Sequence, residues 1–127
     1  MKELKNGVGI WQLLNSIVIT DIISSSGFDY TLIDLEHGFF NIDSILNCVL
    51  ASKASKLKTI VRLPSLSYEE IVRVIDTGID GILFPHIENT KDLEKVSKNI
   101  SKSSEKTLLI RFINKRNQPS YGTVKIK

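Results

Sequence analysis

Hydrophobic and polar positions change period repeatedly along the first 112 residues of this chain. Short β-branched or continuous apolar runs predict five strands, at Val8–Trp11, Tyr30–Asp34, Thr59–Leu63, Gly81–Phe84 and Leu108–Phe112. The segments between these runs carry apolar residues at helical spacing. Alternation of strands with helices is typical of a parallel sheet covered by helices, so we expect an α/β fold.

The helix patterns differ in strength. The segment Ser16–Ser26 is rich in isoleucine and would also suit a strand, but Asn15 or Ser16 can cap a helix at its start. We therefore predict a helix there. The clearest pattern follows Asn41, because apolar residues recur at i, i+3, i+4, i+7 and i+8 over Ile42–Leu50.

Two further helices are predicted in the second half of the chain. Ser67 and Glu70 have the spacing of a capping box, and Gly78 follows the apolar positions that this helix would bury. Asn89 or Thr90 can cap the last helix. After residue 112 no hydrophobic period is visible, so we expect residues 113–127 to form a loose, basic tail.

Composition excludes several classes of function. The chain has 127 residues, 42% hydrophobic and 24% charged, which suits one globular unit with an ordinary core. Its net charge of +3 is mild, and aromatic residues do not interleave with the basic ones, so we expect no nucleic-acid partner. The single Cys48 excludes an internal disulfide. With no apolar leader or membrane-length run, we expect a cytoplasmic protein without membrane contact.

Polar residues that could carry chemistry follow four of the predicted strands. Trp11 and Gln12 follow the first, Asp34–His37 the second, Arg62 closes the third, and His86 follows the fourth. The carboxyl ends of parallel strands meet at one edge of a sheet, where ligands bind in this fold class. We therefore expect a site at that edge. No glycine pattern of a dinucleotide loop or P-loop and no zinc-type spacing is present.

The residues of this edge allow more than one interpretation. His37 stands beside two carboxylates, Asp34 and Glu36, which favours a general base over a loop histidine satisfied by solvent. Glu36 could be catalytic, a metal ligand or a supporting residue. Arg62 could grip a substrate carboxylate or form a salt bridge to Asp34 or Glu36, and the two alternatives are about even.

The remaining two candidates are weaker. Trp11 would line a pocket or pack against the sheet rather than perform chemistry. His86 follows Phe84-Pro85, where a histidine is often structural.

Several motifs in order resemble the HpcH/HpaI aldolase and citrate lyase family, over roughly residues 7 to 88. The matching pieces are Gly9-Ile-Trp11, Ser25-Ser-Gly-Phe-Asp29, Ile33-Asp-Leu-Glu-His-Gly38, Val61-Arg-Leu-Pro64 and Ile75-Asp-Thr-Gly-Ile-Asp-Gly-Ile-Leu-Phe-Pro85. The resemblance implies parallel (β/α) units of a TIM-type barrel, restricted to about its first half. It divides the chain into a partial barrel domain, residues 1–112, and the tail, residues 113–127.

The resemblance also implies an activity. It is cleavage or formation of a carbon–carbon bond in a small 2-oxo acid through a pyruvate-type enolate. His37 would be the acid–base group or would orient a water, Asp34 would hold its ring, Arg62 would bind the keto acid, and Trp11 would contact the substrate. A divalent metal, Mg, Mn or Co, is implied as Lewis acid. Its usual carboxylate ligands are not found in this chain, and Glu36 and Glu88 are the candidate ligands.

Family members run to about twice this length, and an open half barrel exposes unpaired strand edges. We therefore expect either a homo-oligomer or a complementing chain that supplies the second half. The alternative function is a catalytically silent half-barrel remnant that serves as an assembly or small-anion-binding module.

Overall fold

The structure, a computed structural model, describes residues 7–101, 107–113 and 119–125, with side chains described for residues 7–100. One six-stranded sheet runs in the order of the sequence. Its strands are β1 (Gly9–Gln12), β2 (Tyr30–Asp34), β3 (Lys58–Arg62), β4 (Gly81–Leu83), β5 (Thr107–Ile113) and β6 (Pro119–Lys125). The helices are α1 (Ile17–Ser25), α2 (Ile42–Ser55), α3 (Tyr68–Asp76) and α4 (Thr90–Ser101).

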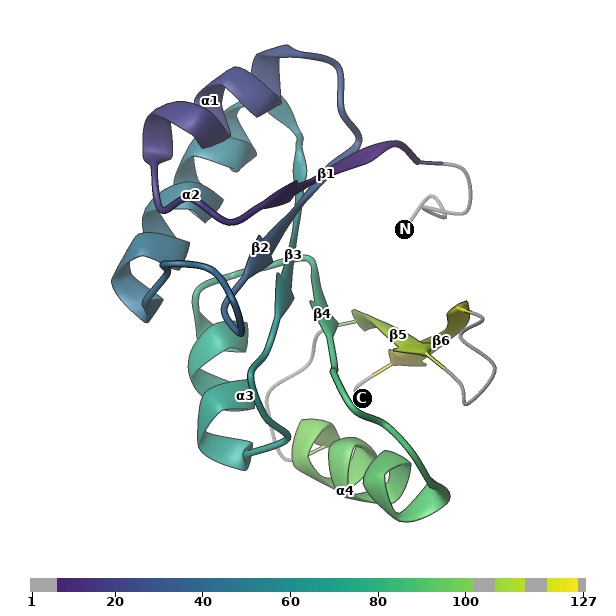
Figure 1. Ribbon diagram of the computed structural model, residues 1–127. Coiled ribbons are helices and arrows are strands. Elements are labelled where there is room, and N and C mark those ends of the chain that lie inside the picture. The colour runs from purple at the N-terminus through teal and green to yellow at the C-terminus, as the bar shows by residue number, and fades with distance from the viewer. Residues whose placement is uncertain (1–6, 102–106, 114–118, 126–127) are drawn as a thin grey trace.

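Strands β1 to β5 are parallel, and each is joined to the next by a helix, as the pattern predicts. The five predicted strands match the structure to within one residue at each end. The structure differs over the predicted tail, because residues 119–125 form β6, which pairs antiparallel with β5. Figure 1 shows α1, α2 and α3 on one side of the parallel strands.

The strand register divides the sheet into two faces. Ile33 of β2 lies beside Val61 of β3, and Val61 lies beside Ile82 of β4. All three are fully buried in the main core, where helices α2, α3 and α4 supply the facing residues. The alternate positions form a second, small cluster on the opposite face, which consists of Leu32, Ile60 and Leu83, with Tyr30 packed against it. The faces alternate because successive side chains of a strand point to opposite sides.

Side-chain caps fix where the first three helices begin. The isoleucine-rich segment after Ser16, which would also suit a strand, forms helix α1. The Ser16 hydroxyl caps it by accepting a hydrogen bond from the Ile19 amide. Asn41 and Ser44 form a reciprocal capping box at α2. At α3 half of the predicted box forms: Ser67 accepts from the Glu70 amide at 3.2 Å, while the Glu70 carboxylate accepts from the Ser65 hydroxyl.

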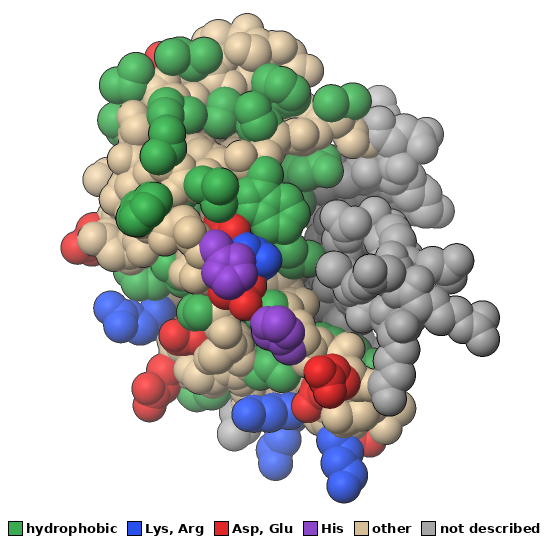
Figure 2. All heavy atoms as spheres, in the orientation of Figure 1, with side chains coloured by type: hydrophobic (Ala, Val, Ile, Leu, Met, Phe, Trp, Pro, Cys, Tyr) green, Lys and Arg blue, Asp and Glu red, His purple; other side chains and the backbone are tan. Residues whose placement is uncertain are grey.

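Exposed apolar side chains lie on helix α1 and on the segment before it, and no described residue covers them. We call this group the α1 apolar surface, and it consists of Leu13, Leu14, Ile17, Val18 and Ile22, each 46–63% exposed. Figure 2 shows these apolar side chains gathered over α1. Strand β1 forms the neighbouring edge of the sheet and pairs on one side, with β2. No helix in the described part of the chain is long and apolar enough to cross a membrane.

Candidate active site at the carboxyl ends of the strands

Strand register creates the centre of the site. Asp34, the last residue of β2, lies directly opposite Arg62, the last residue of β3. Both side chains therefore emerge from the same face of the sheet, and the guanidinium meets the carboxylate through two hydrogen bonds. Arg62 Nε donates to Asp34 Oδ1 at 2.8 Å, and Arg62 Nη2 donates to Asp34 Oδ2. This is the two-point geometry that suits an arginine and a carboxylate.

Asp34 is almost fully buried, with 1% of its side chain exposed, and it is well satisfied. Besides the two bonds from Arg62 it accepts hydrogen bonds from Trp11 Nε1 and from the amides of Glu36 and His37, at 2.9–3.0 Å. Burial would raise the pKa of Asp34, but these donors and the charge of Arg62 lower it from 3.8 to about 2. The carboxylate is therefore ionised at neutral pH.

The loop after β2 folds tightly around Asp34. The Gly38 amide donates to the Asp34 carbonyl oxygen, and a Cβ at Gly38 would lie 2.2 Å from that oxygen. Only glycine fits this close approach without moving the backbone. The next amide, of Phe39, donates to the Leu13 carbonyl and ties this loop to the loop after β1. Glu36 and His37 are thereby held at the mouth of the sheet.

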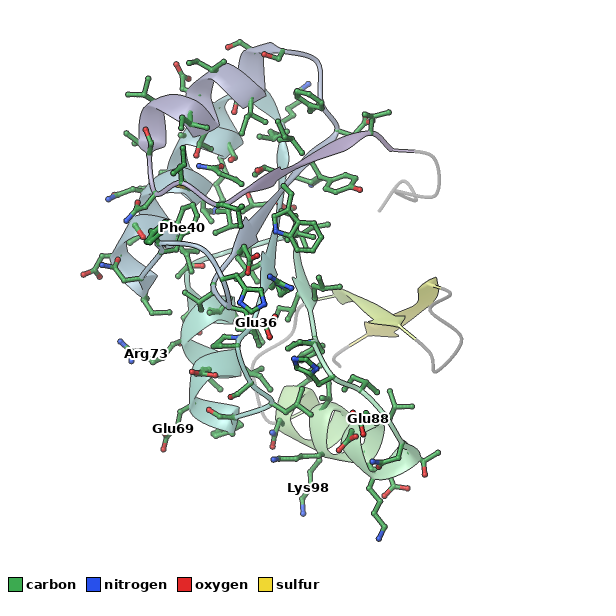
Figure 3. The ribbon with its side chains drawn as sticks, in the orientation of Figure 1. Glu36, Phe40, Glu69, Arg73, Glu88 and Lys98 are labelled. Carbon is green, nitrogen blue, oxygen red and sulfur yellow. The ribbon has the colours of Figure 1, made fainter. Side chains whose placement is uncertain are left out.

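Glu36 connects three strand ends. One carboxylate oxygen, Oε2, lies 3.0 Å from Arg62 Nη1, and the other, Oε1, lies 3.0 Å from His86 Nε2. The ring of His37 is farther away, with Nε2 at 3.9 Å from Glu36 Oε2. Figure 2 shows the two histidines beside acidic and basic side chains in the middle of this face, and Figure 3 shows Glu36 among them. The predicted grouping of His37 with Arg62 is therefore present.

Trp11 packs onto the same group from β1. Its indole donates to Asp34 Oδ2, and the Arg62 guanidinium carbon lies 4.9 Å from its ring centroid, a cation–π distance. Gln12 differs from the expectation, because its side chain points to the other face of the sheet and hydrogen-bonds Thr20. Trp11 thus lines the site, and Gln12 supports the start of α1.

Two sequence interpretations change at this site. The resemblance implied that Asp34 holds the ring of His37, but Asp34 accepts from the His37 backbone amide, and the carboxylate nearest the ring is that of Glu36. The salt-bridge alternative for Arg62 is realised with both acids. The Glu36–His86 pair was not predicted. The position of His86 after a strand was its sole signal in the sequence.

The residues present do not fit a divalent metal. No group of three or more histidine, cysteine, aspartate or glutamate side chains within the described ranges could hold an ion. The oxygens of Asp34 accept bonds from nitrogen donors, and Arg62 and His86 contact those of Glu36. Glu88 lies near α4, apart from Glu36 (Figure 3). A metal would have to compete with these cationic and N–H partners.

Fold and site together define a class of protein: a parallel α/β domain with its ionisable residues at the carboxyl edge of the sheet. Residues 8–116 match the family model described as HpcH/HpaI aldolase/citrate lyase. The chain therefore belongs to the HpcH/HpaI aldolase/citrate lyase family.

Curated relatives agree with this assignment. The 5-keto-4-deoxy-D-glucarate aldolase of Enterobacter sp. (strain 638) is 31% identical over 91 residues, which are 72% of this chain and 35% of the relative. The enzyme of the same name from Escherichia coli O139:H28 (strain E24377A / ETEC) is 28% identical over 88 residues, 69% of this chain and 34% of the relative. This chain thus spans about a third of the length of these relatives.

Solved structures show the same partial coverage. Citrate synthase SbnG superimposes with a TM-score of 0.69 at 28% identity, covering 72% of this chain and 38% of that one. A HpcH/HpaI aldolase/citrate lyase family protein from Burkholderia cenocepacia J2315 also has a TM-score of 0.69, at 25% identity, covering 73% of this chain and 37% of that one. Both neighbours are TIM-barrel proteins, and the present chain matches part of their barrel.

Proposed function

We propose that this chain carries the arginine and acid–base residues of an aldolase-type carbon–carbon lyase that acts on a small 2-oxo acid through an enolate. The observation that supports the proposal most strongly is the convergence of Arg62, Asp34, Glu36 and the two histidines at the carboxyl ends of β2, β3 and β4. The curated relatives are aldolases, and a sugar-derived keto acid is in their name.

Arg62 is suited to hold the substrate carboxylate and the enolate oxygen. Guanidinium has five N–H donors, and the contacts with Asp34 and Glu36 occupy three nitrogen positions. One N–H on each terminal nitrogen is left over among the described contacts. Asp34 fixes the plane of the guanidinium, and Trp11 covers one of its faces. A 2-oxo acid would meet a preorganised donor pair, which stabilises developing negative charge.

His37 is the residue to which the resemblance assigns the acid–base role, either directly or through a water that it orients. Its backbone is fixed by the bond to Asp34, and 67% of its side chain is exposed at the mouth of the site. A divalent metal, generally required by aldolases of this family, would act as Lewis acid; the described residues do not offer it ligands. The roles derived for this chain are therefore substrate binding and proton transfer.

Exchange of the methyl protons of pyruvate with deuterium tests the proposal, because exchange reports enolate formation without an aldehyde partner. The full chain is incubated with pyruvate in deuterium oxide, with and without a divalent ion. We expect exchange that His37→Ala reduces about 100-fold, because an acid–base contribution is lost. Arg62→Ala should reduce it by a similar factor, about 100-fold, because the N–H donors to the enolate oxygen are lost. Lys58→Ala is the matched control, because Lys58 pairs with Asp80 at the opposite ends of the strands. Equal exchange in all four proteins contradicts the proposal.

A partner is the second part of the proposal. The α1 apolar surface lies beside the edge of β1 that no described strand pairs with, so together they would accept a further strand and helix. We propose that another copy of the chain or a complementing chain covers them, and that activity requires this cover. Sedimentation at micromolar concentration tests the homo-oligomer. A stable monomer with full exchange activity contradicts the requirement.

The second candidate function is a silent module that binds small anions. It is favoured by the absence of a metal-holding group from the described residues and by the two carboxylates that already neutralise Arg62. Pyruvate binding without proton exchange, measured by calorimetry and by the exchange assay on one sample, would support this module instead of the lyase.

A further inference from the structure

Glu36 and His86 form the one close carboxylate–imidazole contact among the described residues, at 3.0 Å between Oε1 and Nε2. An ionised carboxylate can only accept a hydrogen bond, so the ring nitrogen must be the donor. When the ring of His86 is neutral, its single proton is then on Nε2. The other nitrogen, Nδ1, has a free lone pair and can accept a proton.

The surroundings hold the carboxylate in place while the ring is open to solvent. Glu36 is 12% exposed in its side chain, and its second oxygen is bound by Arg62, which Asp34 holds in turn. The His86 side chain is 76% exposed. A fixed acceptor therefore orients an accessible base.

The backbone at His86 has an unusual conformation. Its φ angle is +55°, in the left-handed region that residues other than glycine rarely adopt. A backbone strained in this way persists where other contacts hold the residue. Here the contact is with Glu36, which lies 50 residues earlier in the chain. The strained turn directs the imidazole back toward the ends of β2 and β3.

We propose that Glu36 and His86 form a carboxylate–imidazole pair that presents His86 Nδ1 as the group that takes the substrate proton, with His37 in the water-orienting role that the resemblance also allows. The inference rests on the proposed function. His37 lacks an equivalent contact, because its Nε2 is 3.9 Å from Glu36, beyond hydrogen-bond distance. Thus His86, rather than His37, is the histidine whose tautomer the described structure fixes.

The proposed step transfers a proton from pyruvate to His86. The C–H bond at the methyl carbon of pyruvate breaks, and its proton forms an N–H bond with Nδ1 of His86. The electron pair of that C–H bond forms the carbon–carbon double bond of the enolate, and the carbonyl π pair moves to oxygen. The N–H groups of Arg62 that the described contacts leave over would stabilise the resulting negative charge. Nε2 of His86 keeps its hydrogen bond to Glu36, and the Nδ1 proton can return to the carbon.

The tautomer can be measured directly, because the chain has two histidines. Long-range nitrogen–proton NMR spectra distinguish the two tautomers, and His37→Gln assigns the signals. We expect the Nε2–H form to dominate for His86 at alkaline pH, and Glu36→Ala to shift its nitrogen signals. The matched control is Glu88→Ala, an exposed glutamate of the same β4 loop region. A dominant Nδ1–H form, or equal effects of the two substitutions, overturns the pair.

The exchange assay tests the chemical role. We expect His86→Gln to reduce pyruvate proton exchange about 100-fold while pyruvate affinity stays within about 2-fold. Exchange at the wild-type rate in His86→Gln overturns the acid–base role and leaves the lyase proposal standing. If the wild-type chain shows no exchange, the proposed function fails, and the acid–base role of His86 fails with it. In that case the NMR measurement of the tautomer still tests whether Glu36 and His86 form a pair.

Discussion

The site has an inner half and an outer half that are built differently. The inner half, Asp34 and Arg62, is 1% and 17% exposed and comes from neighbouring strand ends in fixed register. The outer half is Glu36 with His37 and His86, whose rings are 67% and 76% exposed on loops. The inner half is part of the packed sheet and is proposed to meet a substrate through Arg62, whereas the histidines of the outer half are open to solvent. The comparison assigns stability mainly to the first and proton transfer to the second.

The inner half should give the largest effect on stability. Asp34→Asn removes the charge that faces Arg62 and leaves a largely buried guanidinium without its main partner, so we expect a loss of about 3 kcal/mol in the free energy of unfolding. Urea denaturation measures it. Asp80→Asn, which breaks the partly exposed pair with Lys58, is the control and should cost about 1 kcal/mol or less. A similar loss in Asp80→Asn would contradict the special contribution of the buried Asp34–Arg62 pair to stability.

Acid should weaken the inner half specifically. The folded-state pKa of Asp34, about 2, lies below its ordinary value of 3.8, so its contribution is fully present above pH 4 and lost as pH falls toward 2. From this difference we expect about 2 kcal/mol of stability to disappear over that window. Denaturation series at several pH values on the wild type and Asp34→Asn check it. A loss of the same size in the variant would contradict the assignment to Asp34.

The loop that joins the halves should be sensitive to a single methyl group. Gly38→Ala places Cβ against the Asp34 carbonyl, so the backbone has to shift, at a cost of about 1–2 kcal/mol. Because the shift would move Glu36 and His37, we also expect slower pyruvate exchange. Gly27→Ala serves for comparison, since its Cβ would meet open space and the strain from its φ of +81° lies outside this loop. Exchange lowered equally by both substitutions would argue against a specific role for the loop.

The smallest effect on stability is expected on the α1 apolar surface. Val18→Lys and Ile22→Lys alter side chains that are 63% and 59% exposed, so we expect changes within about 0.5 kcal/mol for the monomer. Association should instead be weakened, as sedimentation can show. Unchanged association in both variants would mean that the partner binds elsewhere.

The fold could be predicted well because hydrophobic periodicity and helix capping depend on residues that are close in the sequence. The residues Ser16, Asn41 and Ser67 cap helices as their types suggest. Strand β6 could not be predicted, since Pro119 and Gly122 disfavour a strand in isolation and its support is pairing with β5.

The inner half of the site could be predicted because the strands that carry it could be predicted. Asp34 and Arg62 could be placed at one edge because parallel strands end together, and the register then makes them partners. The Glu36–His86 contact depends on a left-handed backbone at His86, which local propensity disfavours and tertiary packing imposes. That is why the sequence alone gave His86 the weaker interpretation.

The most direct test of the central claim, that a 2-oxo acid binds where Arg62 and the two histidines meet, is a pyruvate titration followed by the ring signals of His37 and His86 in NMR spectra. We predict that both sets of signals shift to saturation and that Arg62→Ala abolishes the shifts. Pyruvate binding detected by calorimetry on the same sample, with neither ring signal moving, would contradict it.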